Sequence, residues 1–181
     1  MIVGKHVRLR GVERNDAPYF QAWLNDPEVT AGLATYVPLS LMDEEHWVES
    51  ISHKAQEEKP LAIELNDNET WHLIGDCSFI NLEWANRCAE VGIFIGDKSA
   101  WNKGYGTEVM QLLLKHGFET LNLHRIYLRV YSTNPRAKRS YEKAGFVLEG
   151  TMREAVFRQG RYADIHIMSV LRSEWNPAEA R

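Results

Sequence analysis

Cysteine and proline are scarce in this chain of 181 residues, which has only two cysteines and six prolines. Cys77 and Cys88 form no CxxC pair and no spacing typical of a zinc site. The histidines show no HExxH or comparable ligand spacing, so we predict no metal. These absences exclude a disulfide scaffold, and they predict a cytoplasmic protein because free thiols persist in a reducing compartment.

Long apolar runs are missing as well. No stretch approaches the roughly 20 residues that a membrane-spanning helix needs. The opening, from Met1 to His6, lacks the apolar segment of a signal peptide. The formal net charge of −4 argues against a nucleic-acid binder, which is usually basic. We therefore expect neither a membrane nor a nucleic-acid partner, and mild acidity is compatible with a cationic substrate.

Hydrophobic periodicity predicts one mixed α/β domain over residues 1–181. Strands are expected at 6–10, 61–65, 71–82, 88–95, 125–131, 146–157 and 161–171. Helices are expected after an Asn15-Asp16 cap and before Pro27, between Met42 and Glu58, at 104–123 and at 134–144. Gln159-Gly160 is expected to turn the last two strands into a hairpin.

A strand, a glycine loop and a helix follow one another between Val91 and Thr107. Gly104 and Gly106 lack a Cβ atom, so the backbone there can approach a ligand closely. The first N–H groups of the helix have no internal partner and lie at its positive end. This combination is typical of a phosphate cradle, although a tight turn at Gly104 is the plainer alternative. It is neither a Walker A loop nor a complete GxGxxG fingerprint.

Basic residues crowd the first turn of the helix predicted at 134–144. Asn134 is a suitable N-cap and Pro135 suits the first helical position. Arg136, Lys138 and Arg139 then oppose the helix dipole. An anion bound beside this turn would resolve the conflict, whereas a solvated basic face is the simpler interpretation.

The segment from Tyr141 to Phe146 (YEKAGF), preceded by Asn134, resembles a motif of the GNAT N-acetyltransferase superfamily. The similarity runs from about Glu90 to Leu171 and is strongest to the branch of ribosomal-protein and spermidine acetyltransferases. The resemblance implies an α/β fold whose central mixed, mostly antiparallel sheet has about seven strands and about four flanking helices. It also implies an acyl-CoA core at about 88–171 and an acceptor-shaping part at about 1–66.

The resemblance implies acetyl-CoA as the acyl donor, with the backbone of the strand at 93–95 pairing with its pantetheine arm. The loop at 102–107 would hold the pyrophosphate, and Asn134 would bond the pantetheine amides. Trp101 departs from the Gln or Arg common at that position. The cofactor-binding residues expected in this way are Ile93, Phe94, Ile95, Trp101, Asn102, Lys103, Gly104, Tyr105, Gly106, Thr107, Asn134, Arg136, Ala137, Lys138, Ser140, Tyr141 and Lys143.

The resemblance also makes Tyr141 the general acid that protonates the departing thiolate. A buried structural tyrosine is the alternative. Glu90 and Glu83 are the candidate bases for the amine, and His124 and Asp164 are further ones. For each acid, a solvated surface charge is the plainer interpretation.

The expected activity is that of an acetyl-CoA-dependent N-acetyltransferase acting on a primary amine, with a protein N-terminal amine as the first acceptor. A polyamine, an amino sugar or an antibiotic amine is the alternative acceptor. A non-catalytic acyl-CoA-binding regulator is the alternative from another class, and Tyr141 favours catalysis over it. Relatives often pair, so the resemblance implies a homodimer. Trp23, Trp47, Trp71 and Trp84 are expected in the core or in the wall of an acceptor pocket, and Trp84 is the candidate for the pocket wall.

Overall fold

The computed structural model describes residues 1–68 and 70–176. Its backbone divides into two compact units. The first unit comprises Met1–Phe79 and Gly92–Tyr105, and the second comprises Ile80–Val91 and Gly106–Arg181. Strands β4 (Thr70–Glu83) and β5 (Cys88–Ile95) each run from one unit into the other.

The first unit is built on antiparallel strands. β1 (Ile2–Val3), β2 (Val7–Gly11), β3 (Leu61–Asp67) and β4 are neighbours in that order. The register places Arg10 opposite Ala62 and Ala62 opposite Asp76. Directly opposed residues project from the same face of a sheet, so these three side chains share one face.

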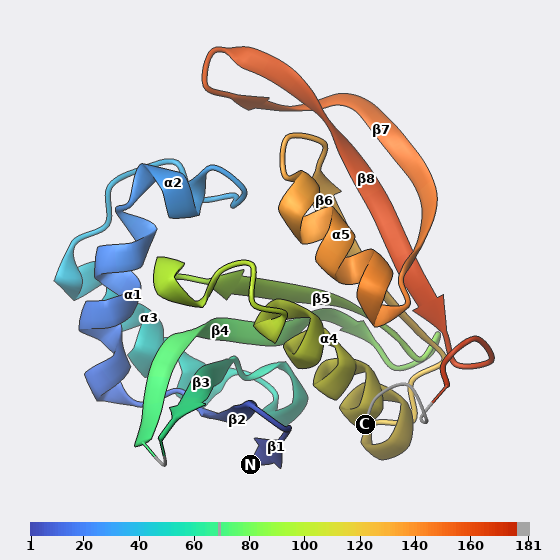
Figure 1. The fold of residues 1–181 in the computed structure, drawn as a ribbon, viewed down its shortest axis with the longest axis horizontal. Helices are drawn as coiled ribbons and strands as arrows, with labels where there is room; N and C mark the ends of the chain where they lie inside the picture. The colour runs from blue at the N-terminus through green and yellow to red at the C-terminus, as the bar shows by residue number, and fades with distance from the viewer. Residues whose placement is uncertain (69, 177–181) are drawn as a thin grey trace. The chain divides into compact units, whose positions relative to one another are not determined.

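Helices α1 (Ala17–Leu24), α2 (Pro27–Thr30) and α3 (Leu41–Ser50) complete the first unit, together with short 3-10 turns. Figure 1 shows α1 and α3 side by side. The contact includes an edge-to-face pair, in which the ring centroids of Phe20 and Trp47 lie 5.8 Å apart. Phe20 is almost wholly buried, so this aromatic contact is the core of the helical layer.

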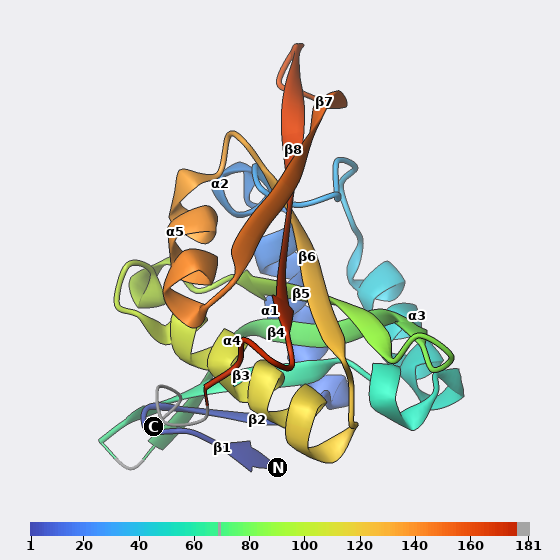
Figure 2. The same cartoon turned by 90° about the vertical axis from the view of Figure 1, so that its right-hand side faces the viewer.

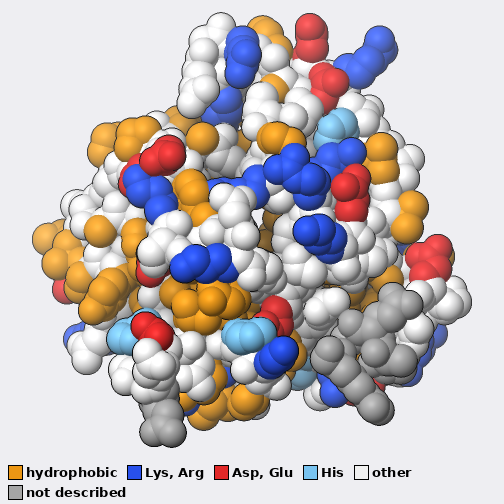
Figure 3. Space-filling model, in the orientation of Figure 1, with side chains coloured by type: hydrophobic (Ala, Val, Ile, Leu, Met, Phe, Trp, Pro, Cys, Tyr) orange, Lys and Arg blue, Asp and Glu red, His pale blue; other side chains and the backbone are white. Residues whose placement is uncertain are grey.

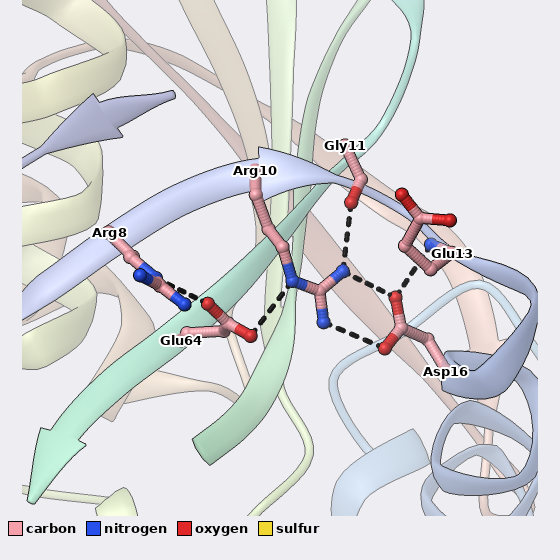
Figure 4. A network of polar contacts seen from close by, with 6 residues as sticks. All are labelled: Arg8, Arg10, Gly11, Glu13, Asp16 and Glu64. Carbon is pink, nitrogen blue, oxygen red and sulfur yellow. Dashed lines mark hydrogen bonds and ion pairs between the residues drawn. The ribbon is translucent and has the colours of Figure 1, made fainter. Parts of the chain in front are cut away.

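Arginines and acids form a network on the β2 face of the first unit (Figure 4). The Arg10 guanidinium donates to both carboxylate oxygens of Asp16, at 2.7 and 2.8 Å, and to Glu64 at 2.8 Å. Arg8 donates to the other oxygen of Glu64 at 2.5 Å. This network attaches the segment before α1 to the sheet, because Asp16 immediately precedes that helix.

Two local predictions for this region are wrong. Asp16 precedes α1 as expected but does not cap it with its side chain; its carboxylate accepts from Arg10 and from the Glu13 N–H instead. Pro27 lies beyond the end of α1, as predicted, and there Asp26 caps a further short helix. The helix expected up to Glu58 ends at Ser50, and 3-10 turns at Ile51–His53 and Gln56–Glu58 follow it.

The second unit holds the remaining strands. The start of β5 pairs in parallel with β6 (Arg125–Tyr131), from Cys88 opposite Arg125 to Glu90 opposite Tyr127. β6 pairs antiparallel with β8 (Arg161–Leu171), which pairs with β7 (Val147–Arg158). Figures 1 and 2 show β7 and β8 as a long hairpin. Its turn lies at Gln159 and Gly160, as predicted, and both residues have positive φ.

Two helices belong largely to the second unit. α4 (Tyr105–Lys115) continues into a π-helical turn at His116–Thr120, so the helix predicted at 104–123 changes its hydrogen-bonding pattern partway. Its predicted apolar stripes are buried, as Val109, Leu113 and Phe118 show. α5 (Pro135–Ala144) has the predicted bounds and ends at Gly145, whose φ of 103° is the left-handed conformation that favours glycine.

The predicted fold class is confirmed. The strand order is β1-β2-β3-β4-β5-β6-β8-β7, so the sheet has eight strands where about seven were expected. β5 and β6 pair in parallel, whereas the β1–β2, β2–β3, β3–β4, β6–β8 and β7–β8 pairs are antiparallel. In the part of the chain that the structure describes, no helix is long and apolar enough to cross a membrane.

Both cysteines are free thiols. Cys77 is 1% exposed, and its burial, reinforced by Asp76, raises the pKa of its thiol well above the usual value. Cys88 is half-buried, and its pKa is raised by partial burial and by the nearby Glu83 carboxylate. Both side chains are therefore mainly protonated thiols at neutral pH.

Candidate functional site

The loop between β5 and α4 is held by its own side chains. Asp97 accepts a hydrogen bond from the Ser99 N–H at 2.8 Å and so starts a 3-10 turn at Lys98–Ala100. The Trp101 indole donates to the carbonyl of Ile95 at 2.7 Å. Trp101, expected beside the pyrophosphate, thus ties the loop to the end of β5.

The glycine loop has the backbone conformation that its sequence predicts. Gly104 has a φ of 90° and Asn102 a φ of 60°, and both values lie in the left-handed region. Glycine adopts this conformation without strain, whereas most side chains disfavour it. α4 begins at Tyr105, directly after the turn. The N–H groups of its first turn, which are not bonded within the helix, therefore follow the glycine turn without an intervening residue.

The start of α5 is capped and basic. The Asn134 side-chain oxygen accepts from the Ala137 N–H at 3.1 Å, as the predicted N-cap should. The first turn contains no acid. Lys138 forms an i,i+4 ion pair with Glu142 at 3.2 Å, so part of the positive charge is compensated within the helix. Figure 3 shows Lys and Arg side chains gathered over α5.

The first turn of α4 lies against α5. The hydroxyl oxygens of Thr107 and Ser140 are 2.9 Å apart and share a hydrogen bond. A Cβ atom added at Gly106 would lie 3.3 Å from the same Ser140 oxygen, so a larger residue there would press on α5. The structure thus brings together Gly106, Thr107 and Ser140 among the predicted cofactor-binding residues.

Tyr141 follows Ser140 on α5, and its ring centroid lies 6.1 Å from that of Phe146. Withdrawal of the phenol from water raises the pKa of Tyr141 to about 12, although the charge of Arg136 works in the opposite direction. The phenol therefore keeps its proton at neutral pH. A protonated phenol is the form that a general acid requires.

The two candidate bases lie in different environments. Glu90 is 5% exposed, and its carboxylate accepts from Arg129 at 2.8 and 3.0 Å and from the Asn81 amide at 3.0 Å. Glu83 is exposed and accepts from the Asn86 amide at 2.8 Å. These three bonds occupy three of the roughly four acceptor positions of a carboxylate, so an amine would compete with Arg129 and Asn81 for Glu90.

The expected pantetheine strand is the end of β5, in the first unit. Phe94 packs its ring against Phe20 and Trp23, with centroids 6.1 and 6.4 Å away. A Cβ atom at Gly75 of β4 would lie 2.1 Å from the Phe94 carbonyl oxygen, so only glycine fits there. Nearby, Tyr105 packs its ring 6.0 Å from that of His6.

The remaining predicted residues differ in their exposure to solvent. Lys103 and Lys143 are exposed, and Arg136 and Ala137 are half-buried on the first turn of α5. Trp84, a candidate pocket wall, is 52% exposed. His116 is half-buried, and loss of solvent lowers the pKa of its imidazole, which suits a packed side chain.

The sequence analysis missed two acids of the first unit, Glu44 and Asp76. Glu44 is 5% exposed, although its neighbours in the helix include the acids Asp43 and Glu45. A signal was present: Glu44 precedes Trp47 by three residues and Ile51 by seven, the spacing of one helix face. An acid in an apolar stripe is therefore the pattern that marks it.

Comparison with known proteins gives a consistent result. A family model described as an acetyltransferase (GNAT) domain matches residues 6–147. An uncharacterised N-acetyltransferase, p20 of Bacillus licheniformis, is 28% identical over 171 residues, which are 94% of this chain and 96% of that protein. The spermidine N(1)-acetyltransferase of Vibrio cholerae is 38% identical over 104 residues, 58% of this chain and 60% of that one.

A solved structure extends the likeness to nearly the whole fold. The spermidine N-acetyltransferase from Vibrio cholerae, in complex with CoA and spermine, superposes with a TM-score of 0.85 at 30% identity. The match covers 94% of this chain and 98% of that chain.

Proposed function

Because the chain belongs to the GNAT acetyltransferase family, we propose that it transfers an acetyl group from acetyl-CoA to a primary amine of a small polyamine. The observation that carries the choice of acceptor is the likeness, over nearly the full length, to a protein solved with CoA and spermine. A peptide N-terminal amine, the first acceptor expected from the sequence, becomes the second candidate.

The fit of acetyl-CoA is supported by the chain's own backbone. The left-handed Gly104 leads into the first N–H groups of α4, and the Thr107–Ser140 bond keeps α5 beside them. Helix N-termini of this kind bind phosphates. We assign the pyrophosphate to the segment 102–107, the pantetheine amides to Asn134 and to the strand at 93–95, and the nucleotide phosphates to Arg136, Lys138 and Lys143. Acetyl-CoA supplies the thioester that carries the acetyl group.

The chain's residues then have three tasks. A backbone N–H at the end of β5 stabilises the negative charge that develops on the carbonyl oxygen. Tyr141 holds a proton on its phenol oxygen and delivers it to the leaving sulfur. An alkylamine, with a pKa near 10.4, is almost wholly charged at pH 7 and must lose a proton before it can attack. Glu83 or Glu90 as the acceptor of that proton stays a prediction.

An acceptor panel tests the proposed function. Release of the CoA thiol is measured with spermidine, with a peptide bearing a free N-terminus and with an amino sugar. We expect spermidine to give the highest kcat/KM. A preference for the peptide would overturn the polyamine assignment. If CoA binds calorimetrically but no amine is acetylated, the chain is the non-catalytic acyl-CoA binder that the sequence left as the alternative.

The role of Tyr141 has its own test. Tyr141→Phe is expected to lower kcat by about 10²-fold, within the usual contribution of acid–base catalysis. Tyr162→Phe is the matched control, because Tyr162 is 65% exposed in the same unit. CoA affinity, measured by calorimetry, is expected to change little in either variant. Equal kcat in both variants would remove Tyr141 from the mechanism.

A further inference from the structure

Four carboxylates are buried to more than nine-tenths among the described residues: Asp16, Glu44, Glu64 and Glu90. Asp16 and Glu64 are bonded by Arg10, and Glu90 is bonded by Arg129. Buried charges in proteins are ordinarily paired in this way, because an unpaired charge loses its hydration without compensation. Glu44 is the exception: no hydrogen bond or ion pair joins its carboxylate to another of residues 1–68 and 70–176, and its oxygens are not among the fully buried atoms without a partner, so they keep contact with water.

Glu44 acts electrostatically on a second acid, Asp76. Asp76 is half-buried on β4, on the sheet face that also carries Arg10, whose partner Asp16 precedes α1. Its carboxyl is withdrawn from water, and this loss of solvent, together with the charge of Glu44, raises the pKa of Asp76 to about 7. Burial and the charge of Asp43 likewise raise the pKa of Glu44. In the described part of the chain, neither carboxyl has a cationic partner.

Aromatic rings accompany the two acids. Trp47 lies one helical turn after Glu44, on the same face of α3. Its indole packs on Phe20, which in turn packs on Phe94 at the end of β5. Gly75, the residue before Asp76, lets β4 approach the Phe94 carbonyl closely. The acids therefore lie within the first unit beside the strand that is expected to hold the thioester arm.

We infer that Glu44 and Asp76 bind the protonated, non-reacting amine of the acceptor, with Trp47 as an aromatic wall. The inference rests on the proposed function, and it gives that function a specificity site. An alkylammonium offers several N–H donors to two carboxylates, and its charge is attracted to the face of an indole ring. A polyamine carries such a second cation, whereas a monoamine does not.

An organic cation suits this site better than a metal ion. Within the described residues, no group of three or more His, Cys, Asp or Glu side chains is arranged to hold a metal. Two carboxylates leave most of the oxygen ligands of a divalent cation unsupplied. Aromatic walls, by contrast, favour cations with apolar stems.

The inference is tested by kinetics on Glu44→Gln and Asp76→Asn, with Glu45→Gln as the matched control. Glu45 is the exposed neighbour of Glu44 on the same helix, so the control removes the same charge without touching the site. We measure KM for spermidine and for butylamine, a monoamine. The KM for spermidine divided by the KM for butylamine is expected to rise about 10- to 100-fold in both site variants, which is the range for a lost charge-assisted hydrogen bond. In Glu45→Gln this ratio is expected to stay unchanged.

A binding experiment separates this inference from the proposed function. The unfolding temperature of the wild type and of each variant is measured in the absence of acetyl-CoA. Each protein is measured alone, with 1,4-diaminobutane added and with Mg²⁺ added. We expect the diamine to raise the unfolding temperature of the wild type and of Glu45→Gln but not of the site variants. If the wild type acetylates no polyamine yet shows this Glu44-dependent shift, the proposed function fails and the ammonium site stands.

Three results would overturn the inference. The diamine could fail to shift the wild type, the shift could survive in Glu44→Gln and Asp76→Asn, or Mg²⁺ alone could produce the Glu44-dependent shift. Far-ultraviolet circular dichroism of each variant shows whether it is folded. Because Gln and Asn keep the size of the acids they replace, a folded variant is the expected result.

Discussion

One face of the first unit carries two sets of buried acids that are treated in opposite ways. The paired acids, Asp16 and Glu64, are bonded by Arg8 and Arg10 (Figure 4). The unpaired acids, Glu44 and Asp76, interact electrostatically and have no cationic partner in the described part of the chain. Chemically identical groups thus serve as structural ties in one place and as an open recognition element in the other, and the neighbouring arginines make the difference.

The pKa values of Glu64 and Asp76 are shifted in opposite directions. Burial alone would raise the pKa of Glu64, but hydrogen bonds from Arg10 and Arg8 outweigh it and hold the pKa below its usual value. Asp76 has no such donors, so loss of solvent and the charge of Glu44 raise its pKa. Ionised Glu64 therefore stabilises the fold at neutral pH, whereas ionised Asp76 destabilises it.

The largest effect is expected from breaking the paired set. Arg10→Met leaves Asp16 buried without its cation and Glu64 with one donor fewer, and it should lower the free energy of unfolding by about 3–5 kcal/mol. Arg14→Met is the control, because the Arg14–Glu49 pair is exposed on both sides and should contribute at most about 1 kcal/mol. Urea unfolding at pH 7 measures both. Equal losses would mean that the buried network is no stronger than a surface pair.

A smaller effect of opposite sign is expected from neutralising the unpaired set. Asp76→Asn should raise the free energy of unfolding at pH 8 by about 1–3 kcal/mol, the cost of an unsatisfied buried group. The pKa of Asp76 is about 7 in the folded chain against 3.8 ordinarily, so the folded state binds the extra proton between these values. Wild-type stability from this group therefore falls as pH rises from about 4 to 7, and the gain in Asp76→Asn should be small at pH 4 and complete at pH 8.

The control for this pH series is Asp67→Asn at the exposed end of β3. The free energy of unfolding of Asp67→Asn should stay within about 0.5 kcal/mol of the wild-type value at every pH. A gain in Asp76→Asn that is equally large at pH 4 would show that packing, and not ionisation, is responsible.

The smallest effect is expected from Glu44→Gln. It removes one of the two causes that raise the pKa of Asp76 but leaves the other, the loss of solvent. We expect a gain of about 1 kcal/mol or less at pH 8, together with a lower midpoint in the pH series, since one pKa unit corresponds to about 1.36 kcal/mol. Unfolding curves of Asp76→Asn and of the variant that carries both Glu44→Gln and Asp76→Asn complete a double-mutant cycle. Strict additivity of the two substitutions would show that the acids do not interact.

The local sequence was sufficient to predict the bounds of a helix or strand where its start and stop signals were complete. The strands at 88–95 and 125–131 have the predicted bounds, because their apolar residues fill a buried sheet. α5 has the predicted bounds because Asn134-Pro135 starts it and Gly145 ends it. α3 lacks such a stop signal before Pro60, and the turn of chain after Ser50 is set by tertiary packing.

The candidate site was predictable in part, for a related reason. The glycine loop and the N-cap of α5 depend on neighbours in sequence, and both have the expected geometry. Glu44 and Asp76 lie 32 positions apart, and their burial depends on how α3 covers β4. The sequence marks Glu44 only by its place in an apolar helix stripe, and it offers no comparable signal for Asp76. The indole bond of Trp101 depends on the loop turning back to the Ile95 carbonyl, and no local sequence pattern predicts it.

The state of the two cysteines has a practical consequence for the assays. A coloured disulfide reagent reacts with thiolates, and the released CoA thiol is freely accessible to it. Cys77 is shielded and Cys88 is mostly protonated, so the protein itself should react slowly with the dye. Turnover can then be followed continuously, without quenching and with a low background, in every variant that keeps β4 and β5 intact.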